Sequence, residues 1–296
     1  MRVTNGMIHG RLLKSLQKTK ERLVRSQVRV ATQKNISKPS EDPIGLSRIM
    51  AYHRDLHKLR QAIRNAENTS SMLSHADTVL QQATDLLIDV RRLAVAMSSD
   101  TVDEDARRSA AYEVELAMDQ VLQKANTKFG GRYIFSGHKI LTQPYQEIGG
   151  VIDYVGDLGE IEQRVGVDGF ITVNIPGSDI FGSSGAGVFK VLLDLKNALD
   201  ANDGTAIQAS MALIDEEMDR ISAALGTVGT RMNLVESNLD QLHGIELSLA
   251  GKLSQIADVD MAVEAAEYMA NQEAYQAALE AASSTLELPN LLDYLQ

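Results

Sequence analysis

The sequence lacks cysteine and tryptophan, and it has few aromatic residues and few prolines. Without cysteine the chain has no disulfides, no thiolate metal ligands and no cysteine nucleophile. Aromatic residues make up only 4% of the 296 residues, which favours long helices over sheet cores. No stretch approaches the roughly 18 apolar residues of a membrane span, and no apolar signal segment follows the basic N-terminus. We therefore expect no membrane insertion and, if the protein leaves the cell, no cleaved signal.

Charge is distributed unevenly along a chain whose formal net charge is −11. Basic residues dominate positions 1–40, where Glu21 is the single acid, and acids dominate positions 251–296, where Lys252 is the single base. The overall negative charge argues against binding of nucleic acid, because phosphates would repel the chain. The opposite charges of the two ends predict that these ends pair with each other. Exposed ion pairs contribute only about 0–1 kcal/mol each, so apolar contacts would have to supply most of the adhesion.

Two long segments carry apolar residues at alternating steps of four and three, the spacing of a coiled-coil seam. The first runs from Tyr52 to Met97 and has one skip near Thr69. The second runs from Ile207 to Ile256 and is broken only at Glu246. A helix of about 50 residues is a rod of roughly 75 Å that must cover its apolar stripe. We therefore predict that the two helices pack side by side.

A third helix is predicted over residues 103–128. Its acids at 103–105 suit a helix N-terminus, where backbone N–H groups are unpaired. Gly130-Gly131 is expected to end it. The short connection over 98–101 predicts that this helix folds back antiparallel on the preceding one.

The segment 136–187 differs from the rest, because it is rich in glycine and has alternating apolar residues. Positions 161–167 alternate, and 170–175 is a strand-like run. Asp157-Leu158-Gly159 and Asp168-Gly169 are turn signals. We predict a small β-rich domain that leans on the helices, because about 50 residues form only a small core.

The two ends are predicted to be helical but weakly apolar. The N-terminal stripe over residues 8–31 is loose and is interrupted at Ser15 and Thr19. Alanine propagates a helix but buries little area, so the C-terminal stripe is also thin. We expect both ends to be mobile in an isolated copy and ordered among neighbouring copies. The C-terminal alanine stripe comprises Ala262, Ala265, Ala266, Ala270, Ala274, Ala277, Ala278, Ala281 and Ala282.

These patterns predict a mainly α fold, a long antiparallel helical bundle or coiled-coil rod with a small inserted β-rich domain. The expected division has three parts. Residues 1–40 with 255–296 form a terminal helical domain, 41–135 with 188–254 form the helical rod, and 136–187 form the β-rich outer domain.

No catalytic constellation emerges from the sequence. His53 and His57 are one helical turn apart, but Arg54 stands where a zinc protease of this spacing needs glutamate. The run 182–186 resembles a nucleophile elbow but lacks its final glycine. Asp258 and Asp260 would face different directions on a helix, so we predict a helix N-cap or a subunit contact there. We expect no enzyme activity, no cofactor and no metal site.

Several segments resemble the bacterial flagellin-like axial proteins. The turn at 37–45, which contains Ser40-Glu41-Asp42-Pro43, is similar to the turn after the first helix of that family, and Gly-Arg-Tyr-Ile-Phe-Ser-Gly at 131–137 is the most specific match. The start at 1–4 and the C-terminal segments 258–262, 276–279 and 291–295 are also similar. Pro289 departs from the pattern, because a proline there would end or bend the last helix.

The resemblance implies a structural subunit at the junction between the hook and the filament of the bacterial flagellum, polymerising through its terminal helices. Implied partners are further copies, the other hook-associated junction protein, flagellin and an export chaperone. It also implies an extracellular location, with type III export and no cleaved signal. Residues matching the motifs become candidates for assembly contacts: Ser40, Glu41, Asp42, Pro43, Arg132, Tyr133, Phe135, Asp258, Asp260, Gln276, Leu292, Tyr294 and Leu295.

Two alternative functions stay open at this point. A filament flagellin shares the terminal signatures. A cytoplasmic coiled-coil signalling or binding protein would be a helical rod with ordered ends and no inserted β domain.

The weakly apolar ends lead to the first prediction. Limited proteolysis of the purified monomer should remove residues near 1–40 and 255–296 first and leave a resistant helical core. Equal resistance along the whole chain would contradict the expectation of mobile ends.

Overall fold

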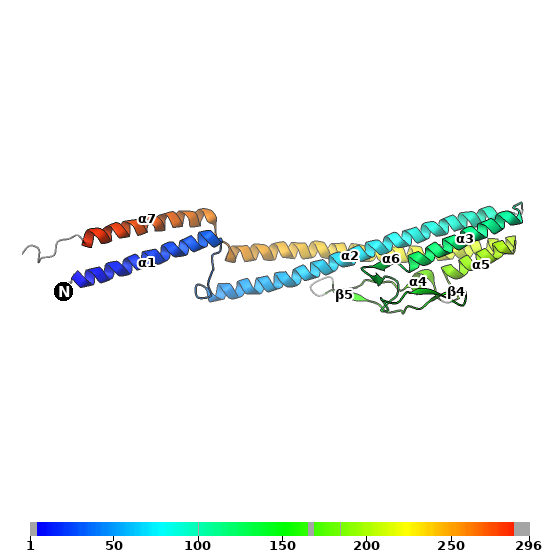
Figure 1. The fold of residues 1–296 in the computed structure, drawn as a ribbon, viewed down its shortest axis with the longest axis horizontal. Coiled ribbons are helices and arrows are strands. Elements are labelled where there is room, and N and C mark those ends of the chain that lie inside the picture. Colours follow the sequence, from blue (N-terminus) through cyan, green and yellow to red (C-terminus); the bar gives the residue numbers. More distant parts are fainter. Residues whose placement is uncertain (1–4, 100, 165–168, 184, 287–296) are drawn as a thin grey trace, which may run out of the picture. The chain divides into compact units, whose positions relative to one another are not determined.

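A computed structural model describes residues 5–99, 101–164, 169–183 and 185–286 (Figure 1). The chain forms two compact units, Met1–His57 with Glu246–Gln296 and Lys58–Ile245, which we call the terminal unit and the central unit. The two long helices α2 (Pro43–Met97) and α6 (Gly204–Ala257) contribute to both. The predicted fold class, mainly α with long paired helices and small antiparallel sheets, is confirmed.

The heptad-spaced seams of α2 and α6 form the spine of the central unit. On α6, residues are buried at seven-residue intervals from Ile207 to Leu242. Leu59 and Ile63 of α2 pack with Leu242, and an ion pair between Arg91 and Asp215 links the two helices beside the seam. The predicted side-by-side packing is therefore confirmed. The buried positions of α2 in this unit are Leu59, Ile63, Ala66, Thr69, Leu73, Ala76, Val79, Leu80, Ala83, Leu87, Val90 and Ala94.

Helix α3 (Glu104–Ala125) begins as the sequence predicts. The carboxylate of Asp103 accepts a hydrogen bond from the Ala106 N–H at 3.0 Å, which satisfies one of the unpaired donors of the first turn. The helix runs back beside α2, where Lys124 Nζ donates to Gln82 Oε1 at 2.8 Å.

The prediction that α3 reaches residue 128 and stops at Gly130-Gly131 is wrong. The helix ends at Ala125, and the following residues form a hairpin of β1 (Lys128–Phe129) and β2 (Arg132–Tyr133). Gly130 and Gly131 have φ values of +56° and +80° and form its two-residue turn. A turn with positive φ at both central residues suits glycine and matches the twist of paired strands.

The β-rich part consists of hairpins that depend on the helices. Within the described residues there are three two-stranded sheets, the second pairing β3 (Tyr145–Ile148) with β4 (Val151–Tyr154) and the third β5 (Glu162–Arg164) with β6 (Phe170–Thr172). Isolated hairpins are marginally stable at best, so they need the helical surface. Figure 1 shows them gathered with α4 (Gly177–Phe181) against one side of the helices.

Specific hydrogen bonds attach the third hairpin to the long helices. The buried Thr69 hydroxyl, at the skip in the α2 seam, donates to Gln163 Oε1 at 2.8 Å. From α6, Arg231 Nη1 donates to the Asn174 carbonyl at 2.8 Å. The interruption in the apolar pattern is thus the place where a strand is attached.

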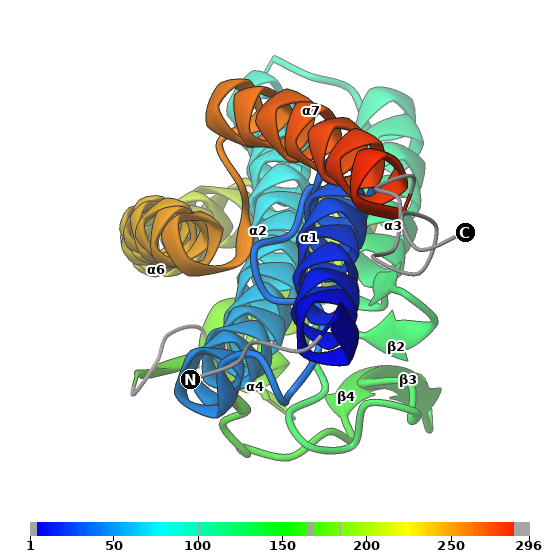
Figure 2. The same cartoon turned by 90° about the vertical axis from the view of Figure 1, so that its left-hand side faces the viewer.

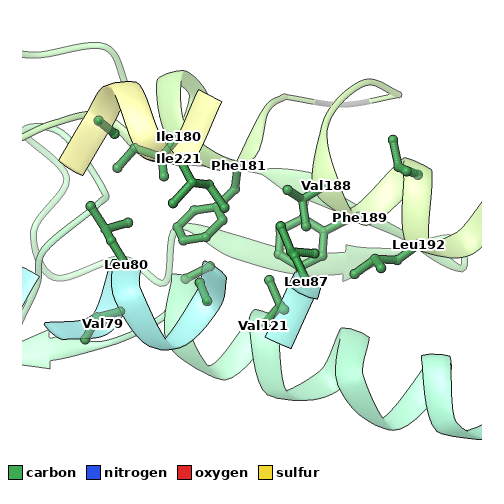
Figure 3. Close-up of a cluster of buried hydrophobic side chains, with 14 of the residues drawn as sticks. Val79, Leu80, Leu87, Val121, Ile180, Phe181, Val188, Phe189, Leu192 and Ile221 are labelled. Atoms are coloured by element: carbon green, nitrogen blue, oxygen red, sulfur yellow. The ribbon is translucent and has the colours of Figure 1, made fainter. Parts of the chain in front are cut away.

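An aromatic cluster joins the hairpins to α4 and α5 (Val188–Asp200). Figure 3 shows two of its rings, Phe181 and Phe189, among the aliphatic side chains of the core. Phe181 is fully buried, and its ring meets those of Phe135 and Tyr145 edge-on at centroid distances of 5.7 and 6.0 Å. The Tyr145 hydroxyl donates to the Gly182 carbonyl at 2.8 Å, so the buried phenol is satisfied. Most of the few phenylalanines in the chain are concentrated here, at the joint between strands and helices.

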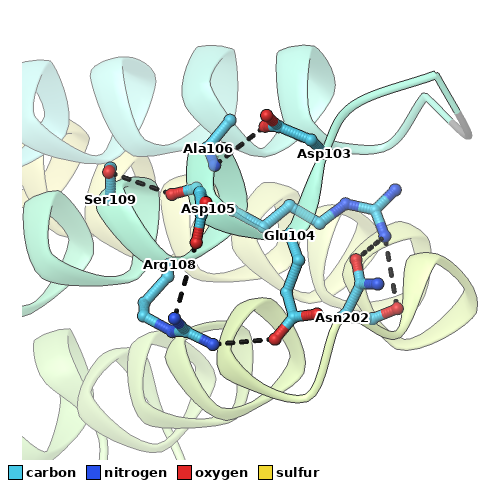
Figure 4. A network of polar contacts seen from close by, with 8 residues as sticks. Asp103, Glu104, Asp105, Ala106, Arg108, Ser109 and Asn202 are labelled. Carbon is cyan, nitrogen blue, oxygen red and sulfur yellow. Dashed lines mark hydrogen bonds and ion pairs between the residues drawn. The ribbon is translucent and has the colours of Figure 1, made fainter.

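Arg107 fastens one end of the central unit, where Figure 4 shows the first turn of α3 beside Asn202. Its side chain is 5% exposed, and it donates to the carbonyls of Met97 at 3.1 Å, Ser99 at 2.9 Å and Asn202 at 3.2 Å. One guanidinium therefore joins the end of α2, the start of α3 and the α5–α6 turn. Such charge-assisted bonds are among the stronger hydrogen bonds in proteins.

The aromatic cluster gives the second prediction. Phe181→Ala should destabilise the central unit by about 3–5 kcal/mol, because it removes a fully buried ring and leaves a cavity. Urea unfolding followed by circular dichroism measures this change. Tyr112→Ala is the control, since Tyr112 is 62% exposed and its loss should cost less than about 0.5 kcal/mol. Equal losses for the two variants would contradict the assignment of Phe181 to the core.

Candidate assembly surface

The terminal unit contains an antiparallel pair of helices, α1 (Asn5–Thr32) and α7 (Met261–Leu286), which lie side by side in Figures 1 and 2. The less exposed residues of each helix repeat in steps of three and four, as in a coiled coil. The pairing of the two ends predicted from charge is therefore present within one copy. The inner positions of α1 are His9, Leu12, Leu16, Thr19, Leu23, Ser26, Arg29 and Val30, and those of α7 are Glu264, Ala265, Tyr268, Asn271, Tyr275, Ala278 and Ala282.

A polar contact fixes the register of this pair. The buried Ser26 hydroxyl donates to Glu264 Oε1 at 3.0 Å, and Arg29 Nη1 lies 3.7 Å from Glu264 Oε2. Glu264 itself is only 5% exposed. A one-residue slip would leave the Glu264 carboxylate without these partners, which carries a large penalty for a buried charge. The seam thus gains specificity from a group that contributes little apolar area.

The alanine stripe of α7 buries little area, as the sequence predicts. Ala265, Ala278 and Ala282 lie toward α1 and are partly buried. The other alanines of the stripe are exposed, and the tyrosines at 268 and 275 take the inner positions instead. The inner face of α7 is set by the heptad phase of its larger side chains. The exposed members are Ala262, Ala266, Ala270, Ala274, Ala277 and Ala281.

A short backbone clasp closes the base of the helix pair. Lys34 and Asp258 form an antiparallel bridge, flanked by bonds from the Asn35 N–H to the Ala257 carbonyl at 2.8 Å and from the Val259 N–H to the Gln33 carbonyl at 3.2 Å. Lys34 Nζ also binds Asp258 Oδ1 at 2.5 Å. The hydrogen bond from Lys34, followed by one from Ser254, lowers the pKa of Asp258. The sequence predicts a helix N-cap or a subunit contact at Asp258, and the structure shows a contact within the chain, to Lys34, that the sequence pattern does not indicate.

The turn between α1 and α2 is held by its own carboxylates. Glu41 Oε2 accepts the backbone N–H groups of Ser37 at 2.9 Å and Lys38 at 3.2 Å. The bond from Ser37 is the main cause that lowers the pKa of Glu41, which nonetheless lies at the surface. Ser40 is exposed in the same turn. The geometry gives Glu41 a structural role in shaping the turn.

Two aspartates cap the helices that leave these connections. Asp42 Oδ1 accepts the Gly45 N–H at 2.8 Å and precedes Pro43, the first residue of α2, a position that suits proline. Asp260 Oδ1 accepts the Ala262 N–H at 2.9 Å at the start of α7. The Asp-Pro pattern and the predicted N-cap at 260 thus have a physical basis in unpaired helix donors.

The remaining candidate residues are divided between the two units. Gln276 is exposed on α7 in the terminal unit. Arg132 and Tyr133 form β2 in the central unit, where Lys128 Nζ lies 4.5 Å from the centre of the Tyr133 ring. Phe135 is 1% exposed and belongs to the aromatic cluster. The roles of these residues in assembly stay predictions. Leu292, Tyr294 and Leu295 lie outside the described residues, as do Pro289 and the matching start at 1–4.

Ser26, Arg29 and Glu264 were missed by the sequence analysis. A heptad phase drawn through Leu12, Leu16 and Leu23 would have placed Ser26 on the seam. The polar residues Thr19 and Ser26 look like interruptions as long as a seam is expected to be apolar.

Within the described residues we searched for groups of metal-ligating side chains and for membrane-spanning helices. No group of three or more His, Cys, Asp or Glu side chains there could hold a metal ion. No helix within the same residues is long and apolar enough to cross a bilayer.

Both ends of the chain match models of a known protein family. Residues 3–140 match the bacterial flagellin N-terminal helical region, and residues 211–295 match the bacterial flagellin C-terminal helical region. Together these regions cover most of the chain, which belongs to the bacterial flagellin family of structural flagellar proteins.

The chain is also similar to individual proteins of known type. The chain is 26% identical to flagellar hook-associated protein 3 of Escherichia coli K12, over 95% of this chain and 96% of the relative. It is 22% identical to the flagellin of Listeria innocua, over 100% and 99% of the two chains. A solved structure of a putative flagellar hook-associated protein from Vibrio parahaemolyticus has a TM-score of 0.70 at 19% identity, over 74% of this chain and 100% of that one. The last match shows that the fold is shared.

The buried carboxylate of the helix pair gives the third prediction. Glu264→Ala should weaken the pairing of α1 and α7 by about 1–3 kcal/mol, because Ser26 and Arg29 lose their acceptor. Pulsed hydrogen exchange should show faster exchange in these two helices, by roughly fivefold or more, with the central unit unchanged. Glu273→Ala, at an exposed position of α7, is the matched control. Equal exchange in the two variants would show that Glu264 does not stabilise the pair.

Proposed function

We propose that the protein is the structural subunit that joins the hook of the bacterial flagellum to its filament. The observation that carries the proposal is the similarity to hook-associated protein 3 over nearly the full length of both chains. The match includes the segment that contains the hairpins, and it is not confined to the terminal helices shared by the family.

The architecture supports a mechanical role. The α2–α6 seam provides a stiff support, and the hairpins are attached to it by the aromatic cluster and by hydrogen bonds from Thr69 and Arg231. In the proposed assembly, segments 1–40 and 255–296 form the inner wall, 41–135 and 188–254 the surrounding helical layer, and 136–187 the outer domain. The Asp42-Pro43 cap would orient α1 relative to α2 in each copy. Such a subunit works through contacts between copies and has no reaction to catalyse.

The proposal extends to location and partners. The subunit would leave the cell without a cleaved signal, through the flagellar type III apparatus and with the help of an export chaperone. In the flagellum it would contact further copies of itself, the other hook-associated junction protein and flagellin. The absence of cysteine is compatible with export as an unfolded chain, since no disulfide could form before assembly.

A filament flagellin is the second candidate. It is favoured by the match to the Listeria innocua flagellin over the whole of this chain. The third hypothesis, a cytoplasmic coiled-coil protein, predicted a helical rod with no β part. The hairpins between α3 and α5 do not fit it.

Immunogold electron microscopy of intact flagella tests the proposal, as the fourth prediction. With an antibody raised against residues 136–187, we expect a short labelled band at the boundary between hook and filament. Flagella from a strain lacking the gene are the control for antibody specificity. Label along the whole filament would support the flagellin alternative, and absence of label from flagella would contradict both flagellar roles.

A further inference from the structure

Helix α6 buries a second face that is distinct from its seam with α2. Ser210, Glu217 and Ala224 repeat at seven-residue intervals and are 4%, 5% and 7% exposed. Arg231 continues this series, and it donates to the carbonyl of Asn174 in the segment after β6. The second face therefore turns toward the β-rich part of the central unit.

Glu217 places a carboxylate among apolar side chains on this helix. Ile214 and Ile221, one turn away on either side, are fully buried. Figure 3 shows Ile221 beside Ile180 of α4 within the hydrophobic cluster. A charged carboxylate in such surroundings is costly unless its partners are strong.

The hydrogen-bond donor given for this carboxylate in the described structure comes from its own helix. Arg220 Nη1 donates to Glu217 Oε2 at 2.7 Å. The Arg220 side chain is 40% exposed, whereas that of Glu217 is 7% exposed. The positive charge therefore lies largely in solvent, which weakens its attraction for a carboxylate held in the core.

The cations of the neighbouring helices are engaged elsewhere. Lys190 of α5 binds Asp194 of the same helix, and Arg91 of α2 binds Asp215 across the seam. These pairs leave Arg220 as the counter-charge of Glu217.

The other titratable groups near Glu217 carry no positive charge. Helix α4 carries Asp179, which is exposed, and the exposed Glu216 precedes Glu217 on α6. From β3, the hydroxyl of Tyr145 donates to a backbone carbonyl, and burial raises the pKa of its phenol, so it stays neutral. The acids repel the Glu217 carboxylate, and the phenol does not offset its charge.

We propose that Glu217 makes the central unit responsive to acid, because its uptake of a proton strengthens the packing of α6 against the β-rich part and α4. As an ionised group it is held in the core by one arginine that lies largely in solvent. As a neutral carboxyl it avoids the cost of a buried charge and can still accept a hydrogen bond from Arg220. This response belongs to one folded copy and does not depend on the proposed function.

The pH dependence of this group has a definite direction. Burial is the main cause that raises the pKa of Glu217, and Arg220 opposes it. A group whose pKa is raised by folding binds protons more tightly in the folded chain. The free energy of unfolding therefore increases as the pH falls through the raised pKa toward the ordinary value for glutamate. The effect is opposite in sign to that of Asp258, whose pKa is lowered.

The variant Glu217→Gln tests this response and gives the fifth prediction. Glutamine has nearly the same shape and does not titrate, so the variant should lose the response to acid. Urea unfolding of the full-length chain, followed by circular dichroism at a series of pH values between neutral and mildly acidic, measures the change. Over this range the unfolding equilibrium constant of the wild type should fall by about twofold or more relative to that of the variant.

The matched control is Glu216→Gln, at the exposed neighbouring position, which should keep the wild-type profile. Asp258 and the histidines titrate in all of these chains, so their contributions cancel when the profiles are compared.

Removal of the counter-charge provides a second test. In Arg220→Gln the carboxylate loses its cation, so the response to acid should become larger than in the wild type. The double variant with Glu217→Gln should lose the response. Because the Arg220 side chain is partly in solvent, this single variant should fold even if Glu217→Gln does not.

Parallel profiles for the wild type and Glu217→Gln would overturn the proposal and leave Glu217 a structural group only. A loss of response in Glu216→Gln equal to that in Glu217→Gln would also overturn it, because burial would then not be the cause. If Glu217→Gln does not fold, a response in Arg220→Gln no larger than that of the wild type overturns it. The immunogold experiment tests the location separately, and neither result decides the other.

Discussion

A helix of more than fifty residues with heptad spacing has one narrow apolar stripe that another element must cover. This requirement determines how the rest of the chain is organised. α2 has 55 residues and α6 has 54, and each carries its apolar residues at heptad spacing. Burial of that stripe is the main favourable term for such helices, because helix propensity alone contributes little. The other elements of the central unit are added to this spine. The hairpins are too small to stand alone and pack on it through one shared core.

The same constraint acts differently in the terminal unit. The inner faces of α1 and α7 include Thr19, Ser26, Glu264 and Asn271, so less apolar area is available than in the α2–α6 seam. Register is determined there by hydrogen bonds to a buried carboxylate. A pair built in this way is specific, because its register depends on one polar contact.

Much of the fold could be predicted because it depends on periodicity. The α2 and α6 seams, the skip at Thr69 and the strands near 161–175 follow from the spacing of apolar residues. The features that were predicted wrongly or not at all depend on local geometry or on contacts between residues distant in sequence. Gly130-Gly131 suits both a helix end and a hairpin turn, and only the pairing of the neighbouring strands distinguishes them. Ser26 and Glu264 are 238 positions apart, and nothing in either local sequence indicates the partner.

The residues of the candidate assembly surface, like the fold, could be predicted only in part. Asp42, Pro43 and Asp260 stand where helix donors need acceptors or tolerate a missing N–H, so sequence and structure agree. Lys34 could not be found, because its role arises only when the α1–α2 connection meets the α6–α7 connection. The alanines of α7 were evident in the sequence. That most of them face away from α1 could not be predicted, because this depends on which neighbouring residues of α7 pack against α1.

The two fastenings of the molecule respond differently to acid. At the clasp of the terminal unit, folding lowers the pKa of Asp258. The ionised carboxylate therefore stabilises the fold at pH values above its pKa in the unfolded chain, and this stabilisation is lost as the pH falls through its pKa in the folded chain. Arg107 in the central unit donates to backbone carbonyls, which do not titrate, and a guanidinium keeps its charge. Acidification therefore loosens the clasp between Lys34 and Asp258 while the Arg107 fastening persists. The backbone bonds of the clasp do not titrate either, so acid removes the side-chain part of this contact and leaves the bridge between residues 33–35 and 257–259 in place.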